Sequence, residues 1–132
     1  MKVVLILGSE SDASWAAKIT GPLAERGIPY EQHVASAHKQ PRRVLEILDA
    51  HASQKQIVYV TIAGRSNALS GFVAANSSFP TIACPPFQDK LDMLVNIHST
   101  LQMPSKTPVL TVLDPGNCAE AVARILGANP AE

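Results

Sequence analysis

Short runs of consecutive apolar residues alternate along this chain with longer segments in which apolar residues recur every three or four positions. Residues 3–7 form an uninterrupted apolar run, which is typical of a strand that is covered on both faces. Comparable runs follow at intervals, and the one that begins at residue 30 is the weakest. The pattern predicts five strands, over residues 3–7, 30–35, 57–62, 81–84 and 109–112.

The segments between these runs have the spacing of amphipathic helices. In residues 12–26, Trp15 and Ile19 belong to a set of apolar side chains on one face, and Gly27 follows where a helix is expected to end. Pro22 lies inside this segment. Because proline cannot donate a helical hydrogen bond, we expect a break or kink near it.

A second helix is expected to begin at Pro41, since proline suits the first helical position. Its apolar residues Val44, Leu45 and Leu48 are predicted to share one face. Three further helices are predicted, over residues 68–76, over residues 91–101, and from residue 115 to near residue 127.

Strands and helices therefore alternate within a length of 132 residues, which fits one domain. This order predicts an α/β fold with three layers, a five-stranded parallel sheet and a flavodoxin- or Rossmann-like topology. In such sheets ligands bind at the carboxyl ends of the strands, where the strand order reverses. A site is thus expected in the loops that follow the first three strands.

The first of these loops contains two hydroxyls next to a predicted helix start. Gly8 permits a tight turn, and Ser11 or Asp12 can cap the helix. Together with free helix N–H groups, the hydroxyls of Ser9 and Ser11 favour an anion such as phosphate. The Asp12 carboxylate repels phosphate and is better suited to sugar hydroxyls. Helix capping without a ligand is the alternative interpretation.

The second loop contains a histidine directly after a strand. Ser36, His38 and Lys39 offer a hydroxyl, a side chain that exchanges protons near neutral pH, and a positive charge. A phosphate ligand can use the hydroxyl and the charge, while a histidine at such a rim can also be incidental. Arg42 and Arg43 follow, and they fit a solvated helix face as well as they fit a ligand.

The third loop carries an isolated charge. Arg65 is the only Asp, Glu, Lys or Arg residue between Lys55 and Asp89. A single arginine in an otherwise uncharged loop indicates a specific anionic partner, and an ordinary surface arginine is the alternative.

The overall charge excludes some partners. Eleven basic residues balance eleven acidic ones, so the net charge is zero, which argues against binding to nucleic acid or anionic lipid through bulk electrostatics. The balance is uneven along the chain, because residues 32–88 contain five basic and two acidic residues. Of these five, Lys39 and Arg65 lie in the candidate loops, and the others are interpreted as surface residues.

Other features indicate a reduced, soluble protein without a metal. Cys84 and Cys118 are expected to be buried thiols, and the N-terminus does not resemble a signal peptide, so a cytoplasmic location is predicted. The longest uncharged stretch, residues 66–88, is interrupted by prolines and makes a poor membrane helix. The remaining histidines are scattered and fit no metal-ligand spacing, and no nucleophile elbow is present.

Three loop motifs occur in order along the chain: Gly-Ser-x-Ser-Asp at 8–12, Ser-Ala-His-Lys at 36–39 and Ala-Gly-Arg-Ser-Asn at 63–67. Cys-Pro-Pro at 84–86 and Leu-Gln-Met-Pro at 101–104 follow them. Together these motifs resemble the phosphoribosylaminoimidazole (AIR) carboxylase family, also called PurE, over nearly the whole chain. The resemblance implies an enzyme of purine biosynthesis.

The third loop separates two classes within that family. Gly-Arg-Ser-Asn at 64–67, together with Lys39, resembles the class that adds CO₂ directly to AIR without biotin, metal, ATP or any other cofactor. The resemblance therefore implies reversible carboxylation of AIR to carboxyaminoimidazole ribonucleotide (CAIR) in de novo purine synthesis. The mutase of the same family, and a non-catalytic phosphosugar-binding paralogue, remain alternatives.

The resemblance also implies roles for particular residues. His38 corresponds to the catalytic acid and base, and no metal ligand is implied. The substrate-binding positions implied by the resemblance are Ser9, Ser11, Asp12, Ser36, Lys39, Gly64, Arg65, Ser66, Asn67 and Leu69.

Assembly is the last implication of the resemblance. Family members form homo-oligomers, typically octamers, and generally continue into another C-terminal helix that packs across subunits. The sequence ends at Glu132, so we expect a single domain, residues 1–132, that lacks this additional helix. Small-molecule substrates (AIR and CO₂) and a homo-oligomer are the expected partners, without nucleic acid or membrane.

Overall fold

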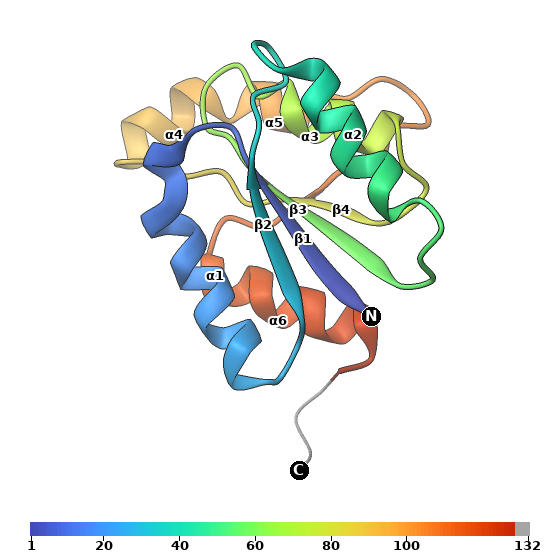
Figure 1. Ribbon diagram of the computed structural model, residues 1–132. Coiled ribbons are helices and arrows are strands. Elements are labelled where there is room, and N and C mark those ends of the chain that lie inside the picture. Colours follow the sequence, from blue (N-terminus) through green and yellow to red (C-terminus); the bar gives the residue numbers. More distant parts are fainter. Residues whose placement is uncertain (129–132) are drawn as a thin grey trace.

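A parallel β-sheet with helices on both of its faces forms the protein (Figure 1). The computed structural model describes residues 1–128. The strand order is β2-β1-β3-β4-β5, so the five-stranded sheet has the predicted flavodoxin-like topology. The strands are β1 (Lys2–Leu7), β2 (Tyr30–Val34), β3 (Ile57–Ile62), β4 (Thr81–Ala83) and β5 (Leu110–Thr111).

The strand order reverses between β1 and β3. From β1 the chain moves outward to β2, and it then returns to place β3 on the other side of β1. Every residue of β3 is buried, as its unbroken apolar run predicted. The carboxyl ends of β1 and β3 are therefore adjacent, and this is where open α/β sheets bind ligands.

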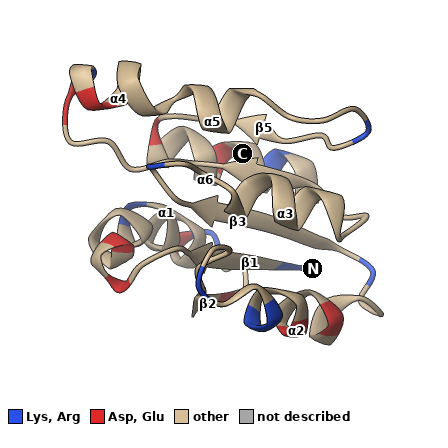
Figure 2. Ribbon diagram, turned by 90° about the horizontal axis from the view of Figure 1, so that it is seen from above, with Lys and Arg blue, Asp and Glu red and all other residues tan. Residues whose placement is uncertain are grey.

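Alternate residues of β1 enter two different cores. Val3, Leu5 and Leu7 pack on the face covered by α1 (Ala13–Glu25) and α6 (Pro115–Leu126). Val4 and Ile6 pack on the opposite face with α2 (Pro41–His51) and α3 (Leu69–Ala75). The two-residue period of a strand thus builds a three-layer domain. Figure 2 shows most of the charged residues on the helices and loops, whereas the central strand β3 has none.

The helix α1 continues through Pro22, so the predicted break does not occur. The lost hydrogen bond falls on an exposed turn, where water can satisfy the carbonyl of Lys18. Meanwhile Ile19 and Leu23, on either side of the proline, are completely buried. Their burial against the sheet and α6 outweighs the cost of the proline.

The buried face of α2 differs from the prediction in one position. Val44, Ile47 and Leu48 are buried, whereas Leu45 is 37% exposed. Leu45 lies about 100° from each of its neighbours around the helix axis, which places it at the edge of the apolar stripe. Pro41 does occupy the first turn, and α6 ends where predicted, with Gly127 in the left-handed conformation (φ 68°).

The single helix predicted over residues 91–101 is divided into α4 (Lys90–Asn96) and α5 (His98–Leu101). The Ser99 hydroxyl donates to the carbonyl of Asn96 at 3.1 Å. The Thr100 N–H donates instead to Ile97, at 3.0 Å. The Asn96 carbonyl therefore accepts a side-chain hydroxyl in place of the Thr100 N–H that it would accept in a continuous α-helix.

The two cysteines are free and completely buried, as predicted. No helix within residues 1–128 combines the length and the hydropathy that crossing a bilayer requires. In the same residues, no three or more His, Cys, Asp or Glu side chains are grouped as metal ligands.

A polar cluster joins β1, β2 and α2 at the edge of the sheet. The Glu31 carboxylate accepts hydrogen bonds from Lys2 Nζ at 2.6 Å and contacts His51 Nε2 at 2.8 Å and His33 Nε2 at 3.2 Å. The Lys2 hydrogen bond is the main cause that lowers the pKa of Glu31 to about 2, and the two histidines act in the same direction. The charged carboxylate is thus favoured in the folded state.

A Glu31→Gln variant should be less stable than the wild type at neutral pH, by about 1 kcal/mol, because half-exposed ion pairs contribute little. Glu31 has a lower pKa when folded than its ordinary value of 4.5, so its contribution is complete above pH ~4.5. The contribution is lost as the pH falls toward about 2. Urea unfolding at pH 7 and at pH 3 should show the gap between variant and wild type narrowing at the lower pH.

Glu46→Gln is the matched control, because within residues 1–128 Glu46 forms one ion pair, with exposed Arg43 at 3.5 Å. This control should change stability by less than the Glu31 variant at pH 7. An equal gap between Glu31→Gln and wild type at both pH values would contradict the assignment.

Candidate active site

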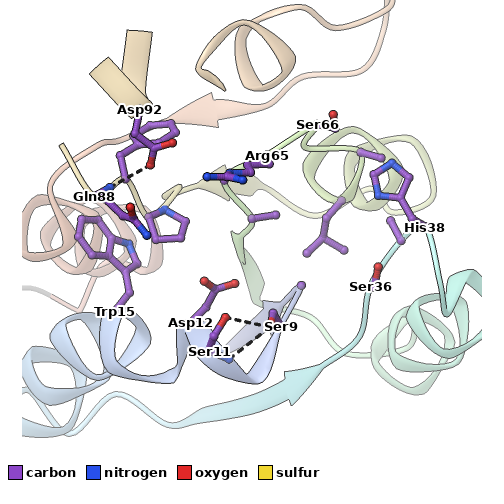
Figure 3. Close-up of a pocket in the computed structure, with 18 of the residues that line it drawn as sticks. Ser9, Ser11, Asp12, Trp15, Ser36, His38, Arg65, Ser66, Gln88 and Asp92 are labelled. Atoms are coloured by element: carbon purple, nitrogen blue, oxygen red, sulfur yellow. Dashed lines mark hydrogen bonds between the residues drawn. The ribbon is translucent and has the colours of Figure 1, made fainter. Parts of the chain in front are cut away.

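A cavity of about 660 Å³ opens at the carboxyl ends of β1 to β4 (Figure 3). All three loops singled out in the sequence line it, and the loop after β4 closes a fourth side. The sequence-predicted residues that line it are Ser9, Ser11, Asp12, Ser36, His38, Gly64, Arg65, Ser66 and Leu69. Lys39 and Asn67 are the two predicted residues that do not line it.

The first loop forms a short 3₁₀ turn, Glu10–Asp12, that precedes α1. Ser9 caps this turn by accepting a hydrogen bond from the Ser11 N–H at 3.3 Å, and the two hydroxyls lie 2.9 Å apart. Asp12 makes no capping hydrogen bond with its side chain, so the capping role considered for it is not used. Its carboxylate instead lines the cavity, where burial raises its pKa.

The second loop presents Ser36 and His38 to the cavity. The Ser36 hydroxyl accepts the Lys39 N–H at 3.2 Å, which fixes the turn and leaves the hydroxyl hydrogen available to a ligand. His38 is exposed and has no hydrogen-bonding partner among residues 1–128. The Lys39 side chain is exposed outside the lining.

The third loop approaches the fourth very closely. A Cβ atom on Gly64 would lie 2.8 Å from the carbonyl oxygen of Pro86, so only glycine fits there without a shift of the backbone. Ser66 has a left-handed backbone (φ 44°), which is uncommon for a residue with a side chain. The loop therefore has a constrained conformation.

Arg65 extends over the cavity from this loop, above Asp12 (Figure 3). Among the described residues it forms no ion pair. The nearby carboxylate of Asp92 is already used, since it accepts the Gln88 N–H at 3.0 Å and the Asn96 side-chain amide at 2.8 Å. The guanidinium group is thus available to an anionic ligand.

The fourth side of the cavity was not predicted from the sequence. It consists of Pro86, Phe87, Gln88 and Asp92, and Trp15 joins it from α1. The Trp15 indole N–H donates to the Cys84 carbonyl at 3.0 Å, which ties α1 to the end of β4. The Cys-Pro-Pro motif at 84–86 was the available signal, because it follows a strand that lies next to β3.

Arg42 and Arg43 do not line the cavity. Arg43 contacts Glu46 one turn along α2, at 3.5 Å, and both side chains are exposed. The interpretation of these arginines as a solvated helix face is therefore the one that the structure supports.

Fold and cavity together define a class: an α/β protein whose cavity is lined by a histidine, several hydroxyls and an arginine that forms no ion pair with residues 1–128. The family model described as AIR carboxylase matches residues 2–132. The phosphoribosylaminoimidazole carboxylase of Archaeoglobus fulgidus is 49% identical over 95% of this chain and 68% of its own length. That of Treponema denticola is 44% identical over 93% of this chain and 77% of its own length.

The crystal structure of Treponema denticola PurE superimposes with a TM-score of 0.88 at 42% identity, covering 96% of this chain and 80% of that one. The chain belongs to the AIR carboxylase family, as the loop motifs predicted. It also matches about 30% of the length of the human bifunctional phosphoribosylaminoimidazole carboxylase/phosphoribosylaminoimidazole succinocarboxamide synthetase, at 36% identity over 96% of this chain.

Proposed function

We propose that this protein catalyses the reversible carboxylation of AIR by CO₂ to CAIR, a step of de novo purine synthesis, without a cofactor. The observation that carries the proposal is that His38 and an unpaired Arg65 face one cavity together with the hydroxyls of three loops. The names of the relatives support the same reaction, since those from Archaeoglobus fulgidus and Treponema denticola are phosphoribosylaminoimidazole carboxylases.

The substrate has a phosphate, a ribose and an amino-substituted imidazole, and each has a suitable partner. Ser9, Ser11 and Ser36 offer hydroxyl donors to the phosphate, and the start of α1 adds partial positive charge. Asp12 is acceptor-only when ionised and suits the ribose hydroxyls. Lys39, which lies outside the lining, adds positive charge next to His38.

In this proposal the third loop and the start of α3 bind the imidazole and CO₂. Gly64 leaves room for the loop to approach Pro86, and Leu69 supplies an apolar contact at the start of α3. Arg65 and Ser66 donate to the carboxylate as it forms, which stabilises negative charge where it develops.

Carboxylation replaces a ring proton by a carboxyl group. The amino-substituted ring is electron-rich, so its carbon attacks CO₂ and forms a carbon–carbon bond while one C=O electron pair moves to oxygen. The tetrahedral ring carbon then loses its proton to His38, and the electron pair restores the aromatic ring. In the reverse direction His38 returns that proton and CO₂ leaves.

The experiment compares two carboxyl donors. Purified protein is incubated either with AIR and labelled CO₂ or with the N-carboxylated nucleotide, and CAIR is measured. We expect CAIR from AIR and CO₂ at a rate that rises with dissolved CO₂. Production only from the N-carboxylated nucleotide would indicate the mutase instead, and binding of AIR without either reaction would indicate a phosphosugar-binding protein.

We also propose that the protein is a homo-oligomer. Leu91, Leu94 and Val95 of α4 are 70%, 61% and 66% exposed, which is a large apolar surface for one short helix. A second copy of the chain would cover it. Light scattering after size exclusion should give a mass several times 14.0 kDa, and a mass of one chain at micromolar concentration would refute this proposal.

A further inference from the structure

Asn67 ends the third loop, and all of its donors are occupied inside the protein. Its backbone N–H donates to Ser99 Oγ at 2.9 Å, and its side-chain amide donates to Thr100 Oγ1 at 2.9 Å and to Ser70 Oγ. Its side-chain oxygen accepts the Ser70 N–H at 3.1 Å. Because that N–H requires an oxygen as partner, the orientation of the amide is fixed.

Asn67 therefore has no donor left for a substrate. Asn67 is 4% exposed and lies outside the cavity lining. A carboxylate in the cavity can meet Arg65 and Ser66, but it finds no free N–H on the Asn67 side chain. The asparagine of this loop thus serves a different purpose from the residues before it.

Two hydroxyls of α5 hold Asn67 in place. Ser99 donates its own hydrogen to the Asn96 carbonyl at 3.1 Å, so its oxygen is left to accept the Asn67 N–H. Thr100 is 1% exposed and accepts from the side chain of Asn67. Neither Ser99 nor Thr100 lines the cavity.

The anchored N–H lies directly after the constrained residue of the loop. Ser66 has φ 44°, and a left-handed backbone is unfavourable for a residue with a Cβ atom. Such a conformation persists only where neighbouring contacts hold it. Asn67 directly follows Ser66, and its hydrogen bonds to Ser99 and Thr100 of α5 are the contacts nearest in the chain that can hold this conformation.

We propose that Ser99 and Thr100 are positioning residues that act through Asn67 to hold Arg65 and Ser66 over the cavity. This inference deepens the proposed function and relies on it for the kinetic readout. Its geometric part, the anchoring of the loop by α5, is independent of which reaction the cavity performs.

The kinetic test removes the hydroxyls one at a time. In Ser99→Ala and in Thr100→Val, kcat/KM for AIR should fall about tenfold or more at a temperature well below unfolding, because small displacements of positioned groups are costly. Ser99→Thr and Thr100→Ser keep a hydroxyl and should retain most of the activity. Ser105→Ala and Thr107→Val remove hydroxyls from the following connection, which makes no hydrogen bond to the loop, and should behave as wild type.

The second test needs no substrate. Amide hydrogen exchange should accelerate at residues 64–70 in Ser99→Ala, with unchanged exchange in α2, none of whose residues lines the cavity. Normal exchange in residues 64–70 together with normal kcat/KM would overturn the inference, even if the variant melts at a lower temperature. If the wild type does not carboxylate AIR, the proposed function fails, while the exchange result still decides whether α5 anchors the loop.

Discussion

The His38→Asn variant is expected to fold and to bind AIR, yet to produce CAIR about 10²–10⁴-fold more slowly than the wild type. His38 is the only histidine among the residues that line the described cavity. Asparagine keeps a similar polar shape but has no group that takes up a proton near neutral pH. The ring proton of the intermediate would then have to leave to water.

Two measurements separate catalysis from binding in this variant. Turnover is followed by CAIR formation under saturating AIR, and AIR affinity is measured by calorimetry. His98→Asn is the matched control, since His98 is exposed on α5 and does not line the cavity. A turnover rate within a few-fold of wild type in His38→Asn would refute the role as acid and base.

Replacement of Arg65 by alanine is expected to raise KM for AIR or to lower kcat, with kcat/KM falling about 10- to 100-fold. A hydrogen bond to a charged group contributes roughly 1.5–3 kcal/mol, and each 1.4 kcal/mol changes a rate or affinity tenfold. Arg65 has no acidic partner among the described residues, so its removal leaves no unpaired charge behind to complicate the result.

Arg65→Lys distinguishes charge from geometry. Lysine keeps the positive charge but loses the planar pair of donors, so it should recover only part of the activity. Arg42→Ala removes a similar charge from the start of α2, outside the cavity, and should change kcat/KM by less than twofold. An equal loss of kcat/KM in the Arg65 and Arg42 variants would mean that positive charge near the cavity, and not a direct contact of Arg65 with the substrate, determines the rate.

The fold was predictable because β1 and β3, at the centre of the sheet, contain unbroken apolar runs, and the segments between strands have the 3.6-residue period of amphipathic helices. The departures arose where a particular side-chain contact outweighed the rule on which the prediction rested. The burial of Ile19 and Leu23 kept α1 continuous through Pro22. One hydroxyl, that of Ser99, divided the helix predicted over residues 91–101.

The site was predictable to the extent that its loops follow strands. Positions 9, 38 and 65 meet because β1, β2 and β3 are neighbours whose carboxyl ends lie at one edge. The direction in which a loop side chain points leaves no pattern in the sequence. The sequence therefore could not show that Asn67 and Lys39 lie outside the cavity lining while their neighbours line it. The wall formed by residues 86–88 was missed because only the first three strands were considered.

The position of Trp15 has a practical consequence. It is the only tryptophan in the 132 residues, and it lies against the cavity with its indole fixed to the Cys84 carbonyl. The tryptophan fluorescence of the protein therefore originates beside the place where a ligand would bind. Nucleotide titrations can be followed by this emission without a label, in the wild type and in every variant described above.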